Sequence, residues 1–326
     1  MSKQENTQEK SRAQHRSKIG GQALIEGVMM KGADTGAMAC RLPDGTIDVE
    51  TWEENNGKNM PWYRKCPLVR GSFNFVLSMK DGYRCLMKSA EKQVTDEDDE
   101  EEEMSRFEKW LSDKLGERLF GIIMGIAMVV GVAISLLLFM YLPKLIVGLL
   151  IKYTPVPDYT LLRSFLEGIL KIAIFITYMG FTACMKDIRR TYEYHGAEHK
   201  TIACHEAGDE LTVENVRKHS RFHPRCGTSF IFITLIVSIL VMCLVPIKII
   251  WLRTLVSLLL LPVTVGISYE FIRLAGRSNS AFTRALSWPG LQIQRITTRE
   301  PDDSQIECAI AAIKPCIPKD LADDEW

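Results

Sequence analysis

Four long apolar stretches constrain the fold of this chain more than any other feature of its sequence. A helix needs about 20 consecutive apolar residues to cross the hydrocarbon core of a bilayer. The stretches are Leu119–Leu142, Leu161–Cys184, Gly227–Ile250 and Trp251–Ala275. A buried core helix rarely needs so long a run of Leu, Ile, Val and Phe. The sequence therefore predicts an α-helical multi-pass membrane protein with four transmembrane helices and a small α+β cytosolic N-terminal region.

Prolines mark the expected connections between these helices. Pro143, Pro155 and Pro157 are expected to break the link between the first two spans, because proline interrupts a helix. Pro246 and Lys248 stand where the third span must turn into the fourth, which predicts a tight helical hairpin.

The distribution of Lys and Arg predicts the orientation in the membrane. Eight Lys and Arg residues lie in the segment Met185–Arg225, whereas the connection Pro143–Thr160 contains only Lys144 and Lys152. Positively charged loops stay on the cytosolic side. We therefore expect a plasma-membrane protein whose 185–225 segment and both termini are cytosolic.

The polar regions suggest further structure outside the spans. Pro43-Asp44-Gly45 is a turn signal between two short strand-like runs, 37–42 and 46–52, and predicts a β-hairpin. Residues 67–91 have the apolar pattern of an amphipathic helix, lying against the membrane or the spans. A further helix is expected to start at Pro301–Ser304 and to run through Ile313.

These observations divide the chain into five expected segments. They are a disordered tail (1–18), a cytosolic α+β region with hairpin and amphipathic helix (19–95), an acidic linker (96–105), a four-helix membrane domain with a cytosolic His-rich loop at 185–226 (106–276), and a cytosolic C-terminal segment (277–326). The formal net charge is zero, so no bulk attraction to nucleic acid is expected. The nine cysteines show no framework spacing, which is typical of free thiols in a reducing compartment.

Histidines concentrate in the 185–226 segment, where five of the six are found. Two of them form the pattern His195-Gly-Ala-Glu198-His199, an H-x-x-E-H arrangement. On a helix, residues four apart share a face, so both imidazoles can reach one metal ion with Glu198 at the edge of that face. This is the reversed form of the H-E-x-x-H zinc signature, whose glutamate is a general base. The alternative is a set of polar side chains that hydrogen-bond among themselves.

A metal site needs more than two ligands, and His223 and Cys226 are the strongest further candidates. If His195, His199, His223 and Cys226 all bind Zn²⁺, the site is closed, and closed four-ligand sites are usually structural. If only three bind, a water in the fourth position can be activated for hydrolysis, with Glu198 as the catalytic residue. The sequence leaves both arrangements open, and it leaves Cys204, His205 and His219 unassigned.

Two other groups of residues invite a functional interpretation. Glu167 and Lys171 lie four apart within the second apolar stretch, where ionisable groups mark either a functional cavity or a local ion pair. Glu270, in the fourth stretch, is expected to pair locally with Arg273. The glycines of Gly20–Gly32 do not have the spacing of a dinucleotide or phosphate loop, and they suggest a close backbone approach with Glu26 as an additional ligand or acceptor.

Four segments resemble the YqhQ-like family of bacterial membrane proteins. They are Gly20–Gly32, the run Tyr194-His195-Gly196-Ala197-Glu198-His199-Lys200-Thr201, the run His223-Pro224-Arg225-Cys226-Gly227-Thr228-Ser229-Phe230, and Pro289–Gln292 with Thr297–Pro301. The resemblance extends over residues 19–313. It implies a domain of unknown function whose members are described as predicted metal-dependent enzymes. It also implies that His195, Glu198, His199, His223 and Cys226 form one constellation.

Two classes of function follow. The first is a membrane-embedded Zn-dependent hydrolase that acts at the cytosolic face of the membrane. The second is a non-enzymatic assembly, translocation or scaffolding factor with a structural metal site, whose basic cytosolic loop meets anionic lipid, a protein partner or the ribosome. A transporter, resting on Glu167, Lys171 and Glu270, is a third interpretation and would require a homo-oligomer.

Overall fold

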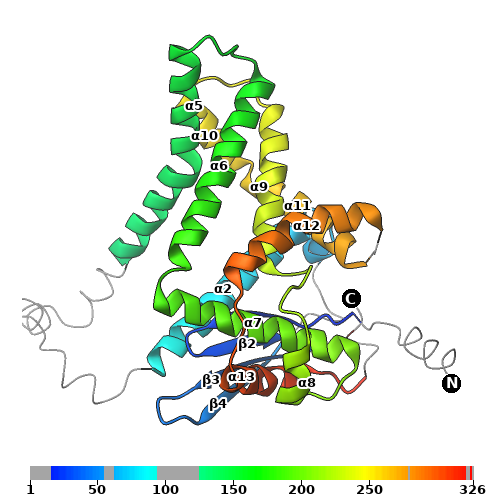
Figure 1. The fold of residues 1–326 in the computed structure, drawn as a ribbon. Coiled ribbons are helices and arrows are strands. Elements are labelled where there is room, and N and C mark those ends of the chain that lie inside the picture. The colour runs from blue at the N-terminus through cyan, green and yellow to red at the C-terminus, as the bar shows by residue number, and fades with distance from the viewer. Residues whose placement is uncertain (1–15, 55–61, 94–124, 278–279, 321–323, 325–326) are drawn as a thin grey trace, which may run out of the picture. The chain divides into compact units, whose positions relative to one another are not determined.

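The computed structural model describes residues 16–54, 62–93, 125–277, 280–320 and 324, and it is mostly helical with a small antiparallel sheet near the N-terminus (Figure 1). The chain forms two compact units. The first, here the α/β unit, contains Met1–Gln93, Tyr178–Thr234 and Pro262–Trp326, and the second, the helical unit, contains Val94–Thr177 and Leu235–Leu261. These units cut across the five expected segments, because the His-rich region and the C-terminal region group with the N-terminal sheet.

The sheet of the α/β unit has four antiparallel strands in the order of the sequence. They are β1 (Gly20–Leu24), β2 (Gly27–Lys31), β3 (Thr35–Arg41) and β4 (Ile47–Glu53). The predicted hairpin is confirmed, and at its turn Gly45 has a φ of +87° while the Asp44 carboxylate accepts a 2.8 Å hydrogen bond from the Thr46 amide. The glycine-rich segment, which the sequence left unassigned, supplies β1 and β2.

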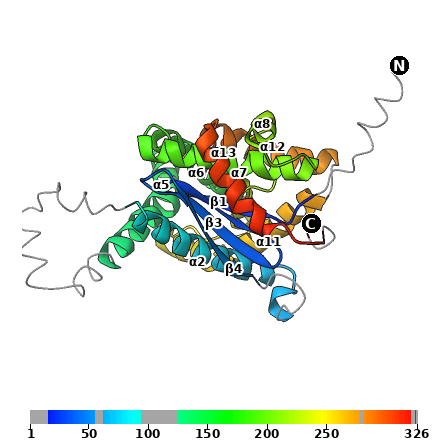
Figure 2. The same ribbon diagram turned by 90° about the horizontal axis from the view of Figure 1, so that it is seen from below.

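The sheet is covered on both faces within the α/β unit, as Figure 2 shows. Side chains of β2 and β3 alternate between two cores, as the period of a strand requires. One core joins the sheet to α7 (Lys186–Ala207) and α13 (Asp303–Ile313), and it includes Val28, Met30, Ala37 and Ala39. The other includes Leu24, Met29, Met38 and Cys40 and packs against α2 (Val69–Glu91).

The remaining helices of this unit include two that the sequence predicted well. The helix α2 occupies the predicted amphipathic segment, and α13 begins after a capping box in which Asp302 accepts from the Gln305 amide at 2.9 Å. The shorter α8 (Val213–Lys218) follows α7, and α11 (Leu261–Arg277) and α12 (Ala281–Thr297) precede α13.

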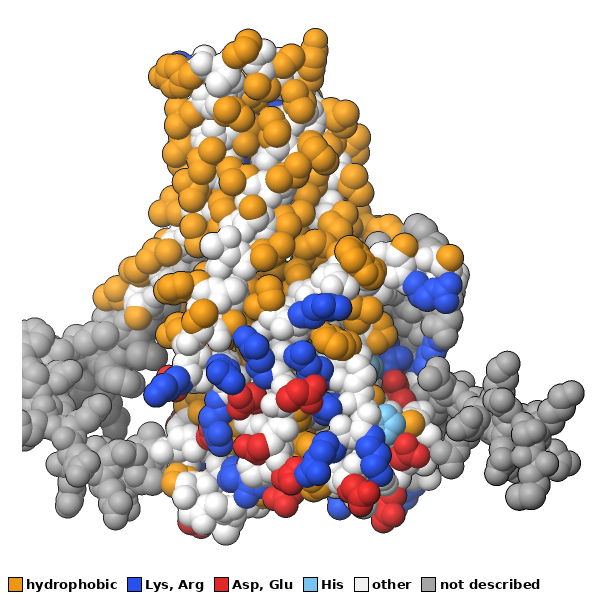
Figure 3. Space-filling view, in the orientation of Figure 1, with side chains coloured by type: hydrophobic (Ala, Val, Ile, Leu, Met, Phe, Trp, Pro, Cys, Tyr) orange, Lys and Arg blue, Asp and Glu red, His pale blue; other side chains and the backbone are white. Residues whose placement is uncertain are grey.

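Fewer helices qualify as membrane spans than the four that the sequence predicts. Among the described residues, Gly125–Tyr153 and α6 (Thr160–Thr182) are long and apolar enough to cross a bilayer. A third span is present if α10 (Ile250–Leu259) and α11, which are bent by 49° at their junction, count as one. The apolar α9 (Gly227–Cys243) has only 17 residues. The expectation of four spans is therefore supported only for two or three. Figure 3 shows the apolar side chains that cover the helical unit.

The expected break at Pro143 is wrong. The helix Gly125–Tyr153 continues through a π-helical stretch, Leu137–Tyr141, into α5 (Leu142–Tyr153), and Pro143 lies in the first turn of α5. A widened turn accommodates the ring and the missing N–H of proline, so the helix is not interrupted. The connection to α6 is instead formed by residues 154–159. Lys144 and Lys152 accordingly belong to a helix, whereas the acidic run and the start of the first predicted span lie outside the described residues.

Ionisable side chains are buried among the helices of the helical unit. The Glu167 carboxylate accepts from Arg253 Nε at 3.0 and 3.1 Å and from Arg163 Nε at 3.3 Å. Among the described residues Lys171 forms no ion pair, and its Nζ lies 3.3 Å from Ser238 Oγ. The local pair of Glu167 with Lys171, one of the two alternatives that the sequence left open, is therefore not formed, and Glu167 pairs with Arg253 and Arg163. In the α/β unit, Glu270 likewise pairs with Arg70 of α2 rather than only within its own helix.

Candidate metal centre

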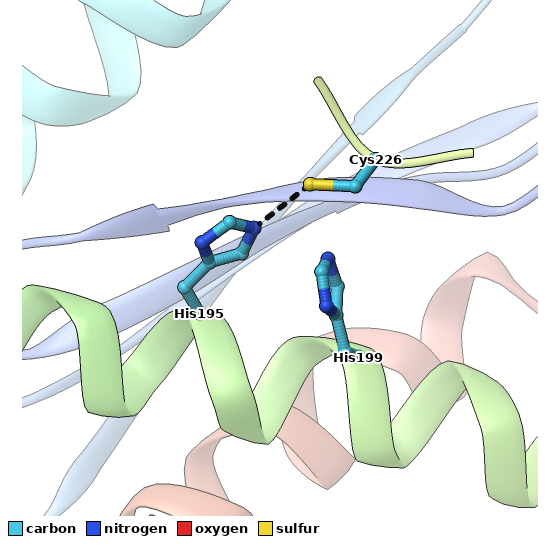
Figure 4. Close-up of side chains that lie close together, drawn as sticks. All are labelled: His195, His199 and Cys226. Carbon is cyan, nitrogen blue, oxygen red and sulfur yellow. Dashed lines mark hydrogen bonds between the residues drawn. The ribbon is translucent and has the colours of Figure 1, made fainter. Parts of the chain in front are cut away.

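Three predicted ligands lie together in the α/β unit. His195 and His199 are one turn apart on α7, and Cys226 immediately precedes α9 (Figure 4). The ligand atoms of the three residues all lie within 4.8 Å of one another. His195 Nε2 is 3.2 Å from Cys226 Sγ, and the centroids of the two imidazole rings are 4.4 Å apart. Two imidazole nitrogens and one sulfur atom therefore converge on a single point.

Backbone carbonyl groups orient both imidazole rings. His195 Nδ1 lies 2.9 Å from the Thr297 carbonyl oxygen, and His199 Nδ1 lies 2.7 Å from the Arg221 carbonyl oxygen. A ring that donates its Nδ1–H to a carbonyl presents Nε2 as the atom with the free lone pair, which is the usual arrangement of metal-ligating histidines. His199 Nε2 is buried and has no hydrogen-bond partner among the described residues. Such an orphaned acceptor is costly unless a ligand satisfies it.

Glu198 stands beside these ligands and faces strand β1. It is only 4% exposed, its carboxylate accepts a hydrogen bond from the Gly21 amide, and its Oε2 is buried without a hydrogen-bond partner in the described structure. A Cβ atom at Gly21 would lie 3.0 Å from the carboxylate carbon, so glycine permits this close approach. Burial raises the pKa of Glu198, while the neighbouring His195 and His199 oppose that shift.

The fourth expected ligand, His223, lies next to the three-residue cluster but is not part of it. Its ring centroid is 5.6 Å from that of His199, and its Nε2 lies 3.6 Å from Glu206 Oε2 and 3.3 Å from Arg225 Nη2. Its main chain exchanges hydrogen bonds of 2.7 and 2.8 Å with the Gln294 side chain. Burial lowers the pKa of His223, so the neutral imidazole is favoured there.

The electrostatics of the cluster favour a charged sulfur atom. Burial by itself raises the pKa of the Cys226 thiol, but the charges of His195 and His199 outweigh it, and the pKa falls well below its usual value. Burial would lower the pKa of His195, but the Cys226 thiolate and its hydrogen bond raise it to about 9. A thiolate is the form of cysteine that binds metals and acts as a nucleophile.

Packing around α7 explains the glycine within the H-x-x-E-H motif. A Cβ atom at Gly196 would overlap the Arg299 carbonyl oxygen, and the Arg299 amide donates to the Tyr192 carbonyl oxygen at 2.8 Å. The segment after α12 therefore crosses α7 in direct backbone contact, which brings the Thr297 carbonyl to His195. The roles of the Thr297 and Arg221 carbonyl groups and of the Gly21 amide could not be predicted from the sequence, because backbone groups carry no side-chain signal.

Other residues singled out from the sequence are engaged elsewhere. His205 Nε2 lies 2.9 Å from Asp324, and His219 Nε2 lies 3.0 Å from Asp209. The buried Cys204 thiol is directed at the Asp209 and Glu210 carbonyl oxygens. Glu26, considered as an additional ligand, pairs with Arg190 and accepts from Tyr194 Oη at 3.1 Å.

Comparisons with known proteins identify the family. No solved structure matches the chain. An uncharacterized protein YqhQ of Bacillus subtilis (strain 168) is 34% identical over 300 residues, which cover 91% of this chain and 92% of that protein. The model of a family described as a protein of unknown function, DUF1385, matches residues 66–319. The expected resemblance to YqhQ is thereby confirmed, and the chain belongs to the DUF1385 family.

Proposed function

We propose that this protein is a zinc-dependent hydrolase whose metal is held by His195, His199 and Cys226 and whose general base is Glu198. One observation carries the proposal. His199 Nε2 and Glu198 Oε2, on neighbouring residues of one helix, are both buried and lack a protein partner, next to three convergent ligand atoms. A bound metal ion and its water would satisfy both groups.

The donor set fits zinc. Imidazole nitrogen and thiolate sulfur are the ligands that Zn²⁺ takes most often in proteins, and catalytic sites combine three protein ligands with one open position. His195, His199 and Cys226 supply three such ligands, and each histidine has the carbonyl partner that fixes its tautomer. The carboxylate of Glu198 is not among the three converging ligand atoms and is therefore available for proton transfer.

Zinc in such a site lowers the pKa of a coordinated water to near neutrality and so supplies a nucleophile. The residues of the chain perform the other tasks. Glu198 accepts the proton of the attacking water, and the Gly21 amide holds its carboxylate in place. The raised pKa of Glu198 brings the carboxylate closer to the neutral range, where a general base works best.

The reaction is proposed to take place at the cytosolic face of the plasma membrane. The support comes from the basic residues between Lys186 and Arg225, several of which lie on α7 and α8. Figure 3 shows Lys and Arg side chains interspersed with Asp and Glu over the α/β unit. Both termini would then be cytosolic. The substrate would be a peptide or a lipid-linked compound that reaches the site from the bilayer.

Burial of the cluster supports a second candidate, a non-enzymatic assembly or scaffolding factor with a structural metal. His199 and Cys226 are almost fully buried, and the ligands join α7 to the segment before α9. His223 is close enough to become a fourth ligand if its contact with Glu206 is broken, which would close the site. In this case the basic surface would bind a protein partner, the ribosome or a second copy of the chain.

Metal content and turnover, measured on the same detergent-purified variants, separate the two candidates. We expect about one zinc per chain in the wild type, and loss of zinc in His199→Ala and Cys226→Ser. Glu198→Gln should retain zinc and lose roughly 10²–10⁴-fold in turnover on a panel of peptide and lipid-linked esters and amides. Glu193→Gln, on the same helix but paired with Arg189, is the matched control.

Each other outcome has a defined meaning. Loss of zinc in His223→Ala, with no turnover in any variant, would contradict the hydrolase and support the second candidate, a structural metal site with four ligands. Absence of zinc and of other divalent metals from the wild type would contradict both candidates. Equal turnover of Glu198→Gln and wild type would refute the assigned base.

A further inference from the structure

The first turns of α2 have their apolar side chains on the outside. The buried residues of this helix are Gly71, Gly82, Cys85 and Ser89. Most of its large apolar side chains are exposed instead, among them Phe73 at 45%, Val76 at 63% and Met79 at 60%. A helix on the surface of a water-soluble domain has the opposite arrangement. The outward face of α2 is therefore chemically suited to a medium less polar than water.

The inward face of α2 contacts α11 mainly through small and polar groups, and beside them the half-buried Phe75 ring lies 5.7 Å from that of Phe230 in α9. A Cβ atom at Gly71 would lie 2.6 Å from Tyr269 Cβ and 3.0 Å from Gly266 Cα, so the two helices touch at their backbones. Ser72 Oγ donates to the Pro262 carbonyl oxygen at 2.7 Å, and Asn74 Nδ2 donates to Tyr269 Oη at 3.0 Å. Small residues and interhelical hydrogen bonds are the usual contacts between helices in lipid, where burial of apolar side chains offers no advantage.

The helix that α2 contacts is itself a candidate membrane segment. The contacted residues of α11 belong to the bent helix pair 250–274, which is long and apolar enough to form a span. The beginning of α2 therefore lies alongside a segment suited to lipid. Aromatic side chains precede α2, with Trp62 78% exposed and the Tyr63 ring 4.7 Å from that of Phe73. Trp and Tyr are enriched at the boundary between membrane and water.

We propose that α2 lies in the cytosolic lipid–water interface, with Val69, Phe73, Val76 and Met79 in contact with acyl chains. Lipid of the bilayer therefore covers the apolar face of α2. Towards its C-terminus the helix leaves the lipid, because Lys88 and Lys92 form ion pairs of 2.6 Å with Glu50 of the sheet. Lys80, which is exposed between these two parts, extends its long side chain to the headgroups, whereas the Arg84 guanidinium lies over the Trp52 ring of the sheet.

In this position α2 brings the bilayer close to the candidate metal centre. The proposal does not depend on whether that centre is catalytically active. Within the α/β unit, Gly82 of α2 packs directly against the Gln22 side chain of β1. The adjacent Gly21 contacts Glu198. A helix in the interface is thus separated from the carboxylate by a single strand.

Photocrosslinking in lipid vesicles tests the proposal on the full-length protein. Benzoylphenylalanine is introduced at position 76, 79 or 88 by replacing Val76, Met79 or Lys88, and the protein is reconstituted in vesicles of phosphatidylglycerol and phosphatidylethanolamine. After irradiation, intact-mass spectrometry measures the lipid adduct. We expect several-fold more lipid adduct at positions 76 and 79 than at the control position 88, which lies on the same helix beside the sheet. Because both lipid-facing positions are exposed, replacement there should leave the fold intact, and unchanged α-helical circular dichroism verifies it.

Three other outcomes overturn the proposal. Lipid adduct at positions 76 and 79 that is as low as a background yield at position 88 would place the whole helix in water. Crosslinked dimers in place of lipid adducts would assign the apolar face to a second copy of the chain, and adducts to another protein would assign it to a partner. The crosslinking results do not depend on zinc content or turnover. The proposed position of α2 can therefore be refuted without refuting the proposed hydrolase, and the hydrolase can be refuted without refuting the position of α2.

Discussion

Two buried polar clusters in this protein differ in whether their hydrogen bonds are complete. In the helical unit, both oxygens of Glu167 accept from Arg253, and the fully buried guanidinium also donates to Ser164 Oγ at 2.6 Å and to the Val245 carbonyl at 2.8 Å. In the α/β unit, His199 Nε2 and Glu198 Oε2 remain without a protein partner. The first cluster is complete within the chain, whereas the second leaves two buried polar atoms unsatisfied among the described residues.

The contrast separates the structural role of the first cluster from the metal-binding role that we propose for the second. Arg253 reaches the connection between α9 and α10 and Glu167 of α6, so it fixes how these helices meet. Nothing further is needed to satisfy the pair. At the candidate metal centre the Thr297 and Arg221 carbonyl groups instead orient the two imidazole rings, and the ligand atoms of His195, His199 and Cys226 lie within 4.8 Å of one another.

The largest effect is expected from Arg253→Met. Removing the arginine leaves Glu167 as a buried carboxylate without its main partner, and breaking a buried ion pair costs about 3–5 kcal/mol of folding free energy. Thermal unfolding in detergent measures this as a lower midpoint. The double variant Glu167→Leu/Arg253→Met should recover most of the loss. A single variant as stable as the wild type would mean that the cluster has no structural role.

Metal removal is expected to have the next largest effect, and only at the second cluster. A metal present at about 100 times its dissociation constant stabilises the folded state by about 2.7 kcal/mol. Chelation should therefore lower the unfolding midpoint of the wild type, while His199→Ala should already unfold at the lower temperature and not respond to the chelator. If the chelator lowers the unfolding midpoints of the wild type and of His199→Ala equally, the metal is bound at a site other than this cluster.

Glu198→Gln is expected to change stability by less than about 1 kcal/mol, because the amide oxygen can still accept from the Gly21 N–H. The same unfolding measurement is made in the presence of metal. This small effect contrasts with Arg253→Met and would show that Glu198 is not retained for folding. A loss as large as that of Arg253→Met would instead make Glu198 part of the structural framework.

The smallest effect is expected from Lys171→Met, within about 0.5 kcal/mol of the wild type or slightly stabilising. Lys171 lies in the helical unit, but among the described residues its ammonium group has only a 3.3 Å contact with Ser238 Oγ, and it does not complete the Glu167 pair. Replacing a poorly paired, half-buried charge by an apolar side chain of similar length removes a desolvation cost. Strong destabilisation in the unfolding assay would reveal a partner for Lys171.

Features set by neighbouring residues were predictable from the sequence. The H-x-x-E-H spacing places His195 and His199 on one face of α7 because a helix repeats every 3.6 residues. Pro43-Asp44-Gly45 forms its hairpin turn, and Asp302 caps α13, because both depend on hydrogen bonds within a few residues. Length and apolar composition alone indicated helices suited to a membrane.

Features set by contacts between distant segments were decided only by the tertiary structure. Cys226 joins the two histidines, whereas His223, three residues earlier, has its imidazole beside Glu206 and Arg225, because Gln294 of α12 holds its backbone. Glu167 is paired with Arg253, 86 residues away, although Lys171 is one turn along its own helix. Local spacing limits which side chains share a face, but the partner that a buried charge or lone pair finally meets depends on how the whole chain packs, since burial makes an unsatisfied group costly.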